Sequence, residues 1–371
     1  MFLLEARVAT SAQPLDERWK RLPVSPRGET LLGISFRPWQ VEAFGLDMQS
    51  TLQTLLAYPF ELIRLAAYWN RIEAGPGQFD TSELDRQLEA AEQAGKRVIV
   101  SVGAIKNFGY PEFFVPSHRL ERPMPEGALV RPSTHGALLS AATKFIGEVA
   151  NRYSGRSSVV AWQLEHEAVD PLGVEHSWRL SEEFVRTELD VLRAADSSRP
   201  VLMNGFLPTT SLVRLSQWWR TRDQGDSLAV AARMADIVGI DYYPRHALFA
   251  LGKRTLYLDG ARRSWQRART DAAVRSLAKG GRRLMVSEGQ AEPWEAVTAP
   301  PNPERQAMFS CRPEDVIQNY DATMAWSRES APLYAYLFWG AEYWVLRSRS
   351  GDPTYLQAFA RILDEARPRI G

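Results

Sequence analysis

The sequence predicts an α/β fold, a (β/α)8 TIM barrel formed as a single domain by residues 1–371. Eight short apolar runs recur along the chain, and several are apolar throughout, as parallel strands covered on both faces are. Longer segments with apolar side chains at helical spacing separate these runs. Eight units of a strand followed by a helix match a closed barrel better than an open sheet.

The eight predicted strands are rich in β-branched and apolar residues. In chain order they are "LLGISF" (31–36), "LIRLAAY" (62–68), "RVIVSVGA" (97–104), "VVAWQLE" (159–165), "PVLMNG" (200–205), "DIVGIDYY" (236–243), "RLMVSEG" (283–289) and "LYAYLFW" (333–339). An open doubly wound sheet is the alternative arrangement. Its nucleotide-binding version would have a Gly-rich turn after the first strand, and "GISFRPWQVEAFG" contains no such pattern.

The helical pattern is clearest in three segments between strands. "TSELDRQLEAAEQAG" (81–95) starts with Thr and Ser, repeats Leu and Ala at helical spacing and ends at Gly. Segments 135–153 and 181–195 behave likewise. The longest predicted loops, 105–134 and 290–315, follow the third and seventh strands and would lie over the barrel face that carries active sites. Residues 1–30 form an N-terminal extension before the first strand.

The charge balance and the single cysteine exclude several classes of function. Forty-five basic and forty-four acidic residues create no field that would favour nucleic acid or an anionic membrane, so neither is expected as a partner. Cys311 alone can form neither an intrachain disulfide nor a cysteine-built zinc site. The first 20 residues lack the basic and apolar regions of a signal peptide, and no run is long enough for a membrane span. We therefore expect a cytoplasmic protein; its oligomeric state is left open.

Two glutamates follow predicted strands at the ends where barrel enzymes place their chemistry. Glu167, in "AWQLEHEAVD", comes just after the fourth strand, and Glu288, in "MVSEGQAEPW", ends the seventh. In retaining glycosidases one carboxylate attacks the anomeric carbon while another carboxyl group, about 5–5.5 Å away, protonates the leaving oxygen. The two glutamates are therefore candidate catalytic residues.

Four segments, in the expected order along residues 31–366, resemble clan A glycoside hydrolases, and in particular families 5 and 42. "AWQLEHE" is similar to their W-Q-x-D-N-E and W-E-x-x-N-E stretches, and "YWNRIEAGPGQFDTSELD" (68–85) to their segment after the second strand. "DIVGIDYYP" (236–244) and "YLFWG" (336–340) are similar to their sixth and eighth strand segments. The resemblance implies a retaining (β/α)8 enzyme that needs no cofactor and no metal.

The resemblance also implies roles for individual residues. Glu167 corresponds to the acid/base and Glu288 to the nucleophile, which Arg64 and Tyr243 would hydrogen-bond. Trp339 corresponds to the tryptophan under the cleaved sugar. The family pattern has Asn directly before the acid/base, where this chain has His166, which can donate the same bond to a sugar hydroxyl in one tautomer. The family 5 histidine near the third strand is absent, since "SVGAIKN" offers only Lys106 and Asn107.

Several other residues are candidates with an alternative structural role. Trp69, Trp294 and Asn204 complete the predicted substrate-binding set, and Trp39 and Trp344 follow strands in the same way. All these tryptophans could instead belong to the core. Two carboxylates compete with the catalytic pair. Glu165 could replace Glu167 as the acid but is expected to be structural and paired with an arginine, and Glu292 is the rival of Glu288.

Other hydrolytic chemistries have weaker signals. "HEAVDPLGVEH" holds His166, Glu167, Glu175 and His176, but Asp170 stands where H-E-x-x-H requires the second His. A serine hydrolase would need a G-x-S-x-G elbow, which is absent. The sequence therefore predicts a retaining β-glycoside hydrolase that cleaves an oligosaccharide or polysaccharide, with a β-linked glucan or mannan favoured. The alternative is a catalytically inactive barrel that binds carbohydrate or a protein partner.

Overall fold

A computed structural model describes residues 2–121, 123–125, 127–170, 178–252, 254–295, 305–329 and 332–367. Eight strands form a closed barrel in which each strand neighbours the next along the chain and the last pairs with the first. These strands are β3 (Leu31–Ser35), β4 (Leu62–Ala66), β5 (Arg97–Ser101), β7 (Val159–Gln163), β9 (Val201–Phe206), β10 (Ile237–Tyr242), β13 (Arg283–Gln290) and β15 (Leu333–Trp339). The predicted (β/α)8 barrel and all eight of its predicted strands are confirmed.

Along the chain, helices lie before, between and after the barrel strands. They are α1 (Phe2–Glu5), α2 (Pro38–Ala43), α3 (Met48–Leu56), α4 (Trp69–Ile72), α5 (Ser82–Gln93), α6 (Gly136–Tyr153), α7 (Glu182–Ala195), α8 (Ser211–Thr221), α9 (Ser227–Met234), α10 (Ser264–Ala278), α11 (Pro313–Glu329), α12 (Ala341–Arg349) and α13 (Thr354–Glu365), with 3-10 turns η1 (Arg18–Arg21) and η2 (Ser117–Arg119). The three helices predicted from the sequence correspond to α5, α6 and α7. Among the described residues, none of these helices combines the length and the apolar character needed to cross a membrane.

In the described part of the chain, seven short strands form small sheets outside the barrel. They are β1 (Ala6–Thr10), β2 (Ala12–Pro14), β6 (Leu129–Val130), β8 (Arg179–Leu180), β11 (Arg245–Leu251), β12 (Arg254–Asp259) and β14 (Gln306–Met308). β1 pairs antiparallel with β12, which also pairs with β11, and β2 pairs with β14. The predicted N-terminal extension is therefore built into small sheets with segments from the second half of the chain.

The chain divides into two compact units, which are described one at a time. The first comprises Met1–Leu62, Leu207–Leu215 and Ile240–Gly371, and the second comprises Ile63–Phe206 and Ser216–Gly239. A single domain over 1–371 stays a prediction.

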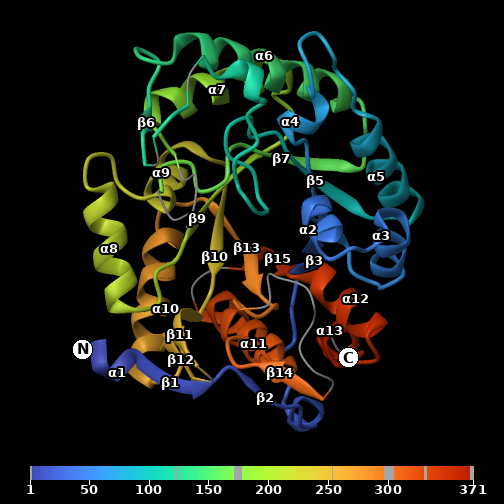
Figure 1. The fold of residues 1–371 in the computed structure, drawn as a ribbon, viewed down its shortest axis with the longest axis vertical. Helices are drawn as coiled ribbons and strands as arrows, with labels where there is room; N and C mark the ends of the chain where they lie inside the picture. The colour runs from blue at the N-terminus through green and yellow to red at the C-terminus, as the bar shows by residue number, and fades with distance from the viewer. Residues whose placement is uncertain are drawn as a thin grey trace. The chain divides into compact units, whose positions relative to one another are not determined.

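In the second unit, α6 and α7 lie side by side (Figure 1) and bury apolar residues at helical spacing, such as Phe145 and Val149 on α6 and Phe184 on α7. Ser181 caps α7 by accepting the N–H of Phe184.

In the first unit, the N-terminal β1 lies against β12, as Figure 1 shows for the blue and yellow ribbons. α11 packs against α13 beside β13 and β15. Close packing requires glycine at several positions, of which Gly289 and Gly340 lie near the candidate site residues of this unit. A Cβ on Gly289 would meet the Tyr336 ring within 2.2 Å, and Gly340 combines a φ of 117° with Glu292 only 2.3 Å from where its Cβ would be.

Candidate active site

Glu288, the predicted nucleophile, lies near the end of β13 and is almost fully buried. The Tyr243 hydroxyl, just after β10, donates a hydrogen bond of 2.6 Å to Glu288 Oε2. Burial, and then the negative charge of Glu288, raises the pKa of Tyr243 well above its ordinary value, so the phenol remains protonated and can donate. The pairing of β13 with β15 is irregular between Val286 and Gly289, an irregularity of the kind that re-aims a side chain.

Trp339, at the end of β15, is partly exposed, and its ring lies 4.3 Å from the Arg37 guanidinium carbon. Arg37 forms a bidentate ion pair with Glu292, at 2.6 and 2.9 Å, and also binds Glu342. Although burial lowers the pKa of Arg37, these two carboxylates raise it well above its ordinary value. Glu292, the rival of Glu288, is therefore engaged by a buried arginine, an arrangement typical of a structural ion pair.

Trp294 keeps an exposed face beside the Glu288 region. It is 39% exposed, and its ring packs edge-on against Tyr243 at 5.7 Å and against His246 at 5.0 Å. An exposed tryptophan face is suited to the C–H face of a sugar ring. Trp39 is likewise partly exposed. Trp344, in contrast, is fully buried, with its ring N–H bonded to the Ala291 carbonyl, so it is a core residue.

In the second unit, Glu167 lies in a turn that starts directly after β7. Glu165 and Glu167 both adopt positive φ angles, of 43° and 44°, which are uncommon outside glycine. The buried Lys106 ammonium bonds the carbonyl oxygens of Glu167 and Asp170 at 2.7 and 2.9 Å. The backbone N–H of His166 in turn donates to the backbone carbonyl of Lys106. Lys106 therefore holds the strained turn from one side.

Glu165 holds the same turn through its side chain. Its carboxylate accepts the backbone N–H groups of Ile105 and Lys106 at 3.0 and 2.5 Å. It also lies beside the fully buried Glu188 of α7. Burial, opposed by the two N–H groups, raises the pKa of Glu165 to about 7, and burial together with Glu165 raises that of Glu188 well above its ordinary value. Glu165 is thus structural, as predicted. Its partners are two backbone amides and a second carboxyl group, however, and not the predicted arginine.

His166 is connected to Glu167 through Asn204 of β9. Asn204 Oδ1 accepts the Gln163 side chain at 3.0 Å and the Glu167 N–H at 3.4 Å, so its Nδ2 faces His166 Nδ1 at 2.9 Å. His166 Nδ1 is then the acceptor, which places the ring proton on Nε2. Burial, and then the charges of Arg64 and Lys106, lowers the pKa of His166 well below its ordinary value. The ring is therefore neutral near pH 7.

Arg64, on β4, is fully buried in the same unit. Its guanidinium donates to Gln163 Oε1 at 3.1 Å and lies 4.1 Å from the centre of the Phe108 ring. Asn204, Gln163 and Arg64 thus form a connected row that ends at the backbone of Glu167. The predicted bond between Arg64 and Glu288 stays a prediction.

The chain shows no match to any protein-family model and none to the curated proteins. It is similar in structure to GH5_18 from Streptomyces cattleya in complex with GlcNAc, with a TM-score of 0.54, 14% identity and coverage of 85% of this chain and 71% of that one. It is also similar to xylanase 10B from Thermotoga petrophila in complex with xylobiose, with a TM-score of 0.54, 13% identity and coverage of 93% and 98%.

A third similar structure is a β-galactosidase from Bacillus circulans, with a TM-score of 0.55 and 13% identity; the match covers 91% of this chain but 56% of that one. At identities this low, such likenesses establish the barrel fold and nothing finer. The fold is therefore one that glycoside hydrolases use, and the assignment of residues depends on the geometry described above.

The structure corrects one predicted site residue. Trp69 has no exposed surface; its ring stacks on Phe145 at 5.5 Å and its N–H bonds Glu73 at 2.7 Å. It begins α4, which turns its ring into the core under α6, so no sugar can stack on it.

Glu175 and His176, weighed as metal ligands, lie outside the described residues. Sequence reasoning did not identify Arg37 or the bracing role of Lys106, because their importance depends on partners far away in the chain.

Proposed function

We propose that the protein is a retaining β-glycoside hydrolase in which Glu288 is the nucleophile and Glu167 the acid/base. The observation that carries this proposal is the short hydrogen bond from the Tyr243 hydroxyl to Glu288 Oε2, at the carboxyl end of a barrel strand. A phenol that stays protonated orients this carboxylate without protonating it, as a carboxylate nucleophile requires.

The proposed reaction has two steps. In the first, a Glu288 oxygen bonds the anomeric carbon while the bond from that carbon to the leaving oxygen breaks, and Glu167 transfers its proton to the leaving oxygen. In the second, Glu167 removes a proton from water, the water oxygen bonds the anomeric carbon, and Glu288 departs as a carboxylate. Both glutamates are then restored, and no cofactor takes part.

The neighbouring side chains have roles that follow from their own contacts. His166, with its proton on Nε2, is a donor suited to the sugar 2-hydroxyl, the task of the family asparagine. Asn204 acts through His166 and through the Glu167 N–H, so we propose a positioning role for it. Trp339 and Trp294, both with exposed surface, would stack on sugar rings.

The proposed substrate is a β-linked chain, with glucan or mannan favoured. The exposed Trp294, in the segment that directly follows β13, supports a site that binds several sugar units. Among the structural neighbours are proteins named as a xylanase and an exo-β-1,4-mannosidase. A panel of β-glucans, β-mannans, xylan and aryl β-glycosides would identify the sugar.

Covalent trapping tests the proposal directly. An activated 2-fluoro sugar should label Glu288, and Glu288→Gln should abolish the label and lower turnover by about 10³-fold or more, as expected when a covalent nucleophile is lost. Glu89→Gln, on the exposed side of α5, is the matched control and should leave both unchanged. NMR of the first product should show retained anomeric configuration.

Two outcomes would contradict the proposal. Turnover by Glu288→Gln close to that of the parent would exclude Glu288 as the nucleophile. Binding of oligosaccharides without turnover of any substrate in the panel would favour the alternative, an inactive barrel that binds carbohydrate.

A further inference from the structure

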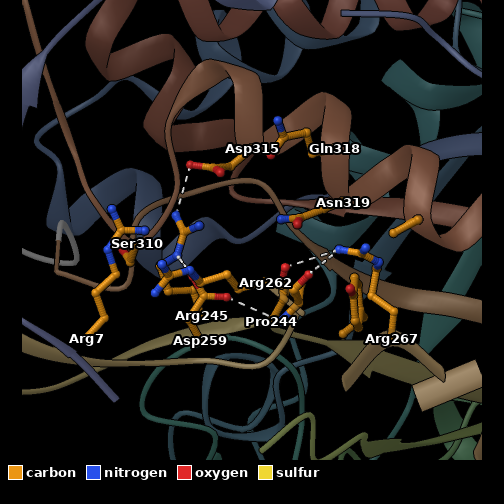
Figure 2. A pocket seen from close by; sticks show the side chains of 13 residues that line it. Arg7, Pro244, Arg245, Asp259, Arg262, Arg267, Ser310, Asp315, Gln318 and Asn319 are labelled. Atoms are coloured by element: carbon orange, nitrogen blue, oxygen red, sulfur yellow. Dashed lines mark hydrogen bonds and ion pairs between the residues drawn. The ribbon is translucent and has the colours of Figure 1, made fainter. Parts of the chain in front are cut away.

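A hollow of about 380 Å³ lies in the first unit, and its lining does not include Tyr243 or Glu288. Residues from β1, from the segment after β10, from the end of β12 and from α11 line it, and Figure 2 shows their side chains. Tyr242, which precedes Tyr243, lines this hollow, while Tyr243 bonds Glu288. Its volume is within the range of small-molecule sites.

The hollow carries more positive than negative charge. Among the described residues, four arginines line it, Arg7, Arg245, Arg262 and Arg267, against two carboxylates, Asp259 and Asp315. The difference, four minus two, leaves an excess of two positive charges at the lining.

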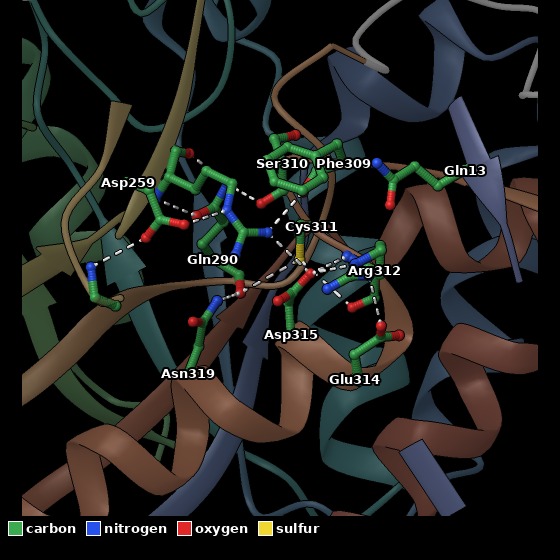
Figure 3. Close-up of polar contacts among 12 residues, drawn as sticks. Gln13, Asp259, Gln290, Phe309, Ser310, Cys311, Arg312, Glu314, Asp315 and Asn319 are labelled. Carbon is green, nitrogen blue, oxygen red and sulfur yellow. Dashed lines mark hydrogen bonds and ion pairs between the residues drawn. The ribbon is translucent and has the colours of Figure 1, made fainter. Parts of the chain in front are cut away.

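The two carboxylates are already engaged by Arg245 and Arg312. Arg245 binds Asp259 at 3.3 Å and Asp315 at 3.1 Å, and it also donates to the Phe309 carbonyl at 2.6 Å. Asp315 accepts both the backbone and the side-chain N–H of Arg312, as the dashed lines in Figure 3 show. Although burial raises the pKa of Asp315, Arg245 and Arg312 lower it further, so the net shift is downward. Asp315 is therefore ionised at neutral pH, and its carboxylate is bound by these two arginines.

Arg7 and Arg262 provide excess charge together with Arg267, whose guanidinium donates to the carbonyls of Ala261 and Arg262. Arg7 and Arg262 are exposed at the hollow, and no carboxylate of the described ranges lies within ion-pair distance of either side chain. The Arg7 guanidinium lies 4.5 Å from the centre of the Phe309 ring, and that of Arg245 lies 4.6 Å from the same ring. Partial burial, and then the charges of Arg245, Arg262 and Arg312, lowers the pKa of Arg7. This direction is expected for a guanidinium group that is surrounded by other positive charges.

From this geometry we infer that the hollow binds a small molecule bearing a phosphate or similar oxyanion, with Arg7 and Arg262 as its guanidinium donors. Guanidinium groups bind phosphate oxygens in pairs. Gln318 of α11 provides an amide group in the lining for an uncharged part of the ligand. The inference does not depend on the glycoside hydrolase proposal.

Calorimetric titration of the full chain tests the inference, with sodium phosphate, glucose 6-phosphate and glucose as probes. The two phosphates should bind, more weakly as salt increases, and glucose should not. Arg7→Gln with Arg262→Gln should weaken phosphate binding about tenfold or more, because two charge-assisted contacts are lost. Arg131→Gln with Arg282→Gln, which removes the same charge from exposed arginines outside the hollow, should bind as the parent does.

A lysine pair at the same positions separates charge from geometry. Arg7→Lys with Arg262→Lys keeps the charge but not the paired donors, so its affinity should fall between those of the parent and the glutamine pair. The inference is overturned if the parent binds neither phosphate at millimolar concentrations, if glucose binds as well as its phosphate, or if the glutamine pair binds phosphate like the parent. Thermal unfolding of each variant checks that it is folded. We expect all variants to fold, because both substituted positions are exposed.

Discussion

At the scale of single residues, the bond between Tyr243 and Glu288 is the contact most open to a clean test. Tyr243→Phe removes one hydroxyl and keeps the ring that packs on Trp294. Because a hydrogen bond to a charged group contributes about 1.5–3 kcal/mol, kcat/KM on aryl β-glycosides should fall about 10- to 100-fold. Steady-state kinetics measures this loss.

A matched control is available elsewhere in the chain. The Tyr153 hydroxyl also bonds a carboxylate, that of Asp85, at 2.8 Å, but it lies outside the candidate site. Tyr153→Phe should lower the unfolding temperature while leaving kcat/KM unchanged. Equal activity of Tyr243→Phe and the parent would remove the main support for Glu288 as the nucleophile.

The sequence predicted some of these residues and not others for a physical reason. Glu288 lies near the end of one barrel strand and Tyr243 directly after another, so the strand pattern alone indicates the barrel end at which they lie. Trp69 also follows a strand, but the chain turns there into α4, which directs the ring into the core. Arg37 gives no local signal, because its importance comes from Glu292 and Glu342, both more than 250 positions away.

At the scale of elements, the turn that carries Glu167 depends on the loop that carries Lys106. Lys106→Met keeps the length of the side chain but leaves the carbonyls of Glu167 and Asp170 without their ammonium donor. Unpaired buried acceptors cost about 1–3 kcal/mol each, so we expect a lower unfolding temperature. Since the sugar-binding side chains remain, kcat should fall more than KM changes.

Steady-state kinetics and thermal unfolding measure these two effects together. Lys144→Met, on the exposed side of α6, is the control for loss of a lysine charge. A Lys106→Met protein with reduced stability and unchanged kcat would show that Lys106 has only a structural role.

The buried pair of Glu165 and Glu188 makes a prediction about pH. The pKa of Glu165 is raised from 4.5 to about 7, so its contribution to stability is complete below pH 4.5 and is lost as pH rises through about 7. Glu188→Gln replaces the second carboxyl group with an amide that can donate to Glu165 at any pH. The variant should therefore match the parent near about pH 5 and exceed it by a few degrees in unfolding temperature near about pH 8.

Thermal unfolding across this range measures the difference. Lys106, whose charge favours ionised Glu165, and the N–H groups of Ile105 and Lys106 are unchanged in the variant. Parallel curves for parent and variant would show that the pair does not set the pH dependence. Sequence reasoning placed Glu165 correctly among structural groups but could not find Glu188, which reaches it from α7.

At the scale of the whole molecule, the periodic pattern of the sequence predicted the barrel and its eight strands. The predicted ends differ from the observed ones where loop residues are also apolar. The run 97–104 extends past β5, which ends at Ser101, because Val102 and Ala104 are buried in the loop that follows. The small sheets could not be predicted. The partners of β1 and β2 lie far away in the chain, and no local sequence pattern identifies them.

The N-terminal extension provides the last prediction. β1 covers one edge of β12, β2 pairs with β14, and the buried Glu5 binds Arg269 and the N–H of Ser211. Deleting residues 1–21 exposes these two strand edges and leaves Arg269 without Glu5, and breaking a buried ion pair alone costs about 3–5 kcal/mol. We expect the urea midpoint of the truncated chain to fall well below that of the full chain. Glu5→Gln, which removes only the charge, should give part of that loss, and equal midpoints for the truncated and full chains would show that the extension adds nothing to stability.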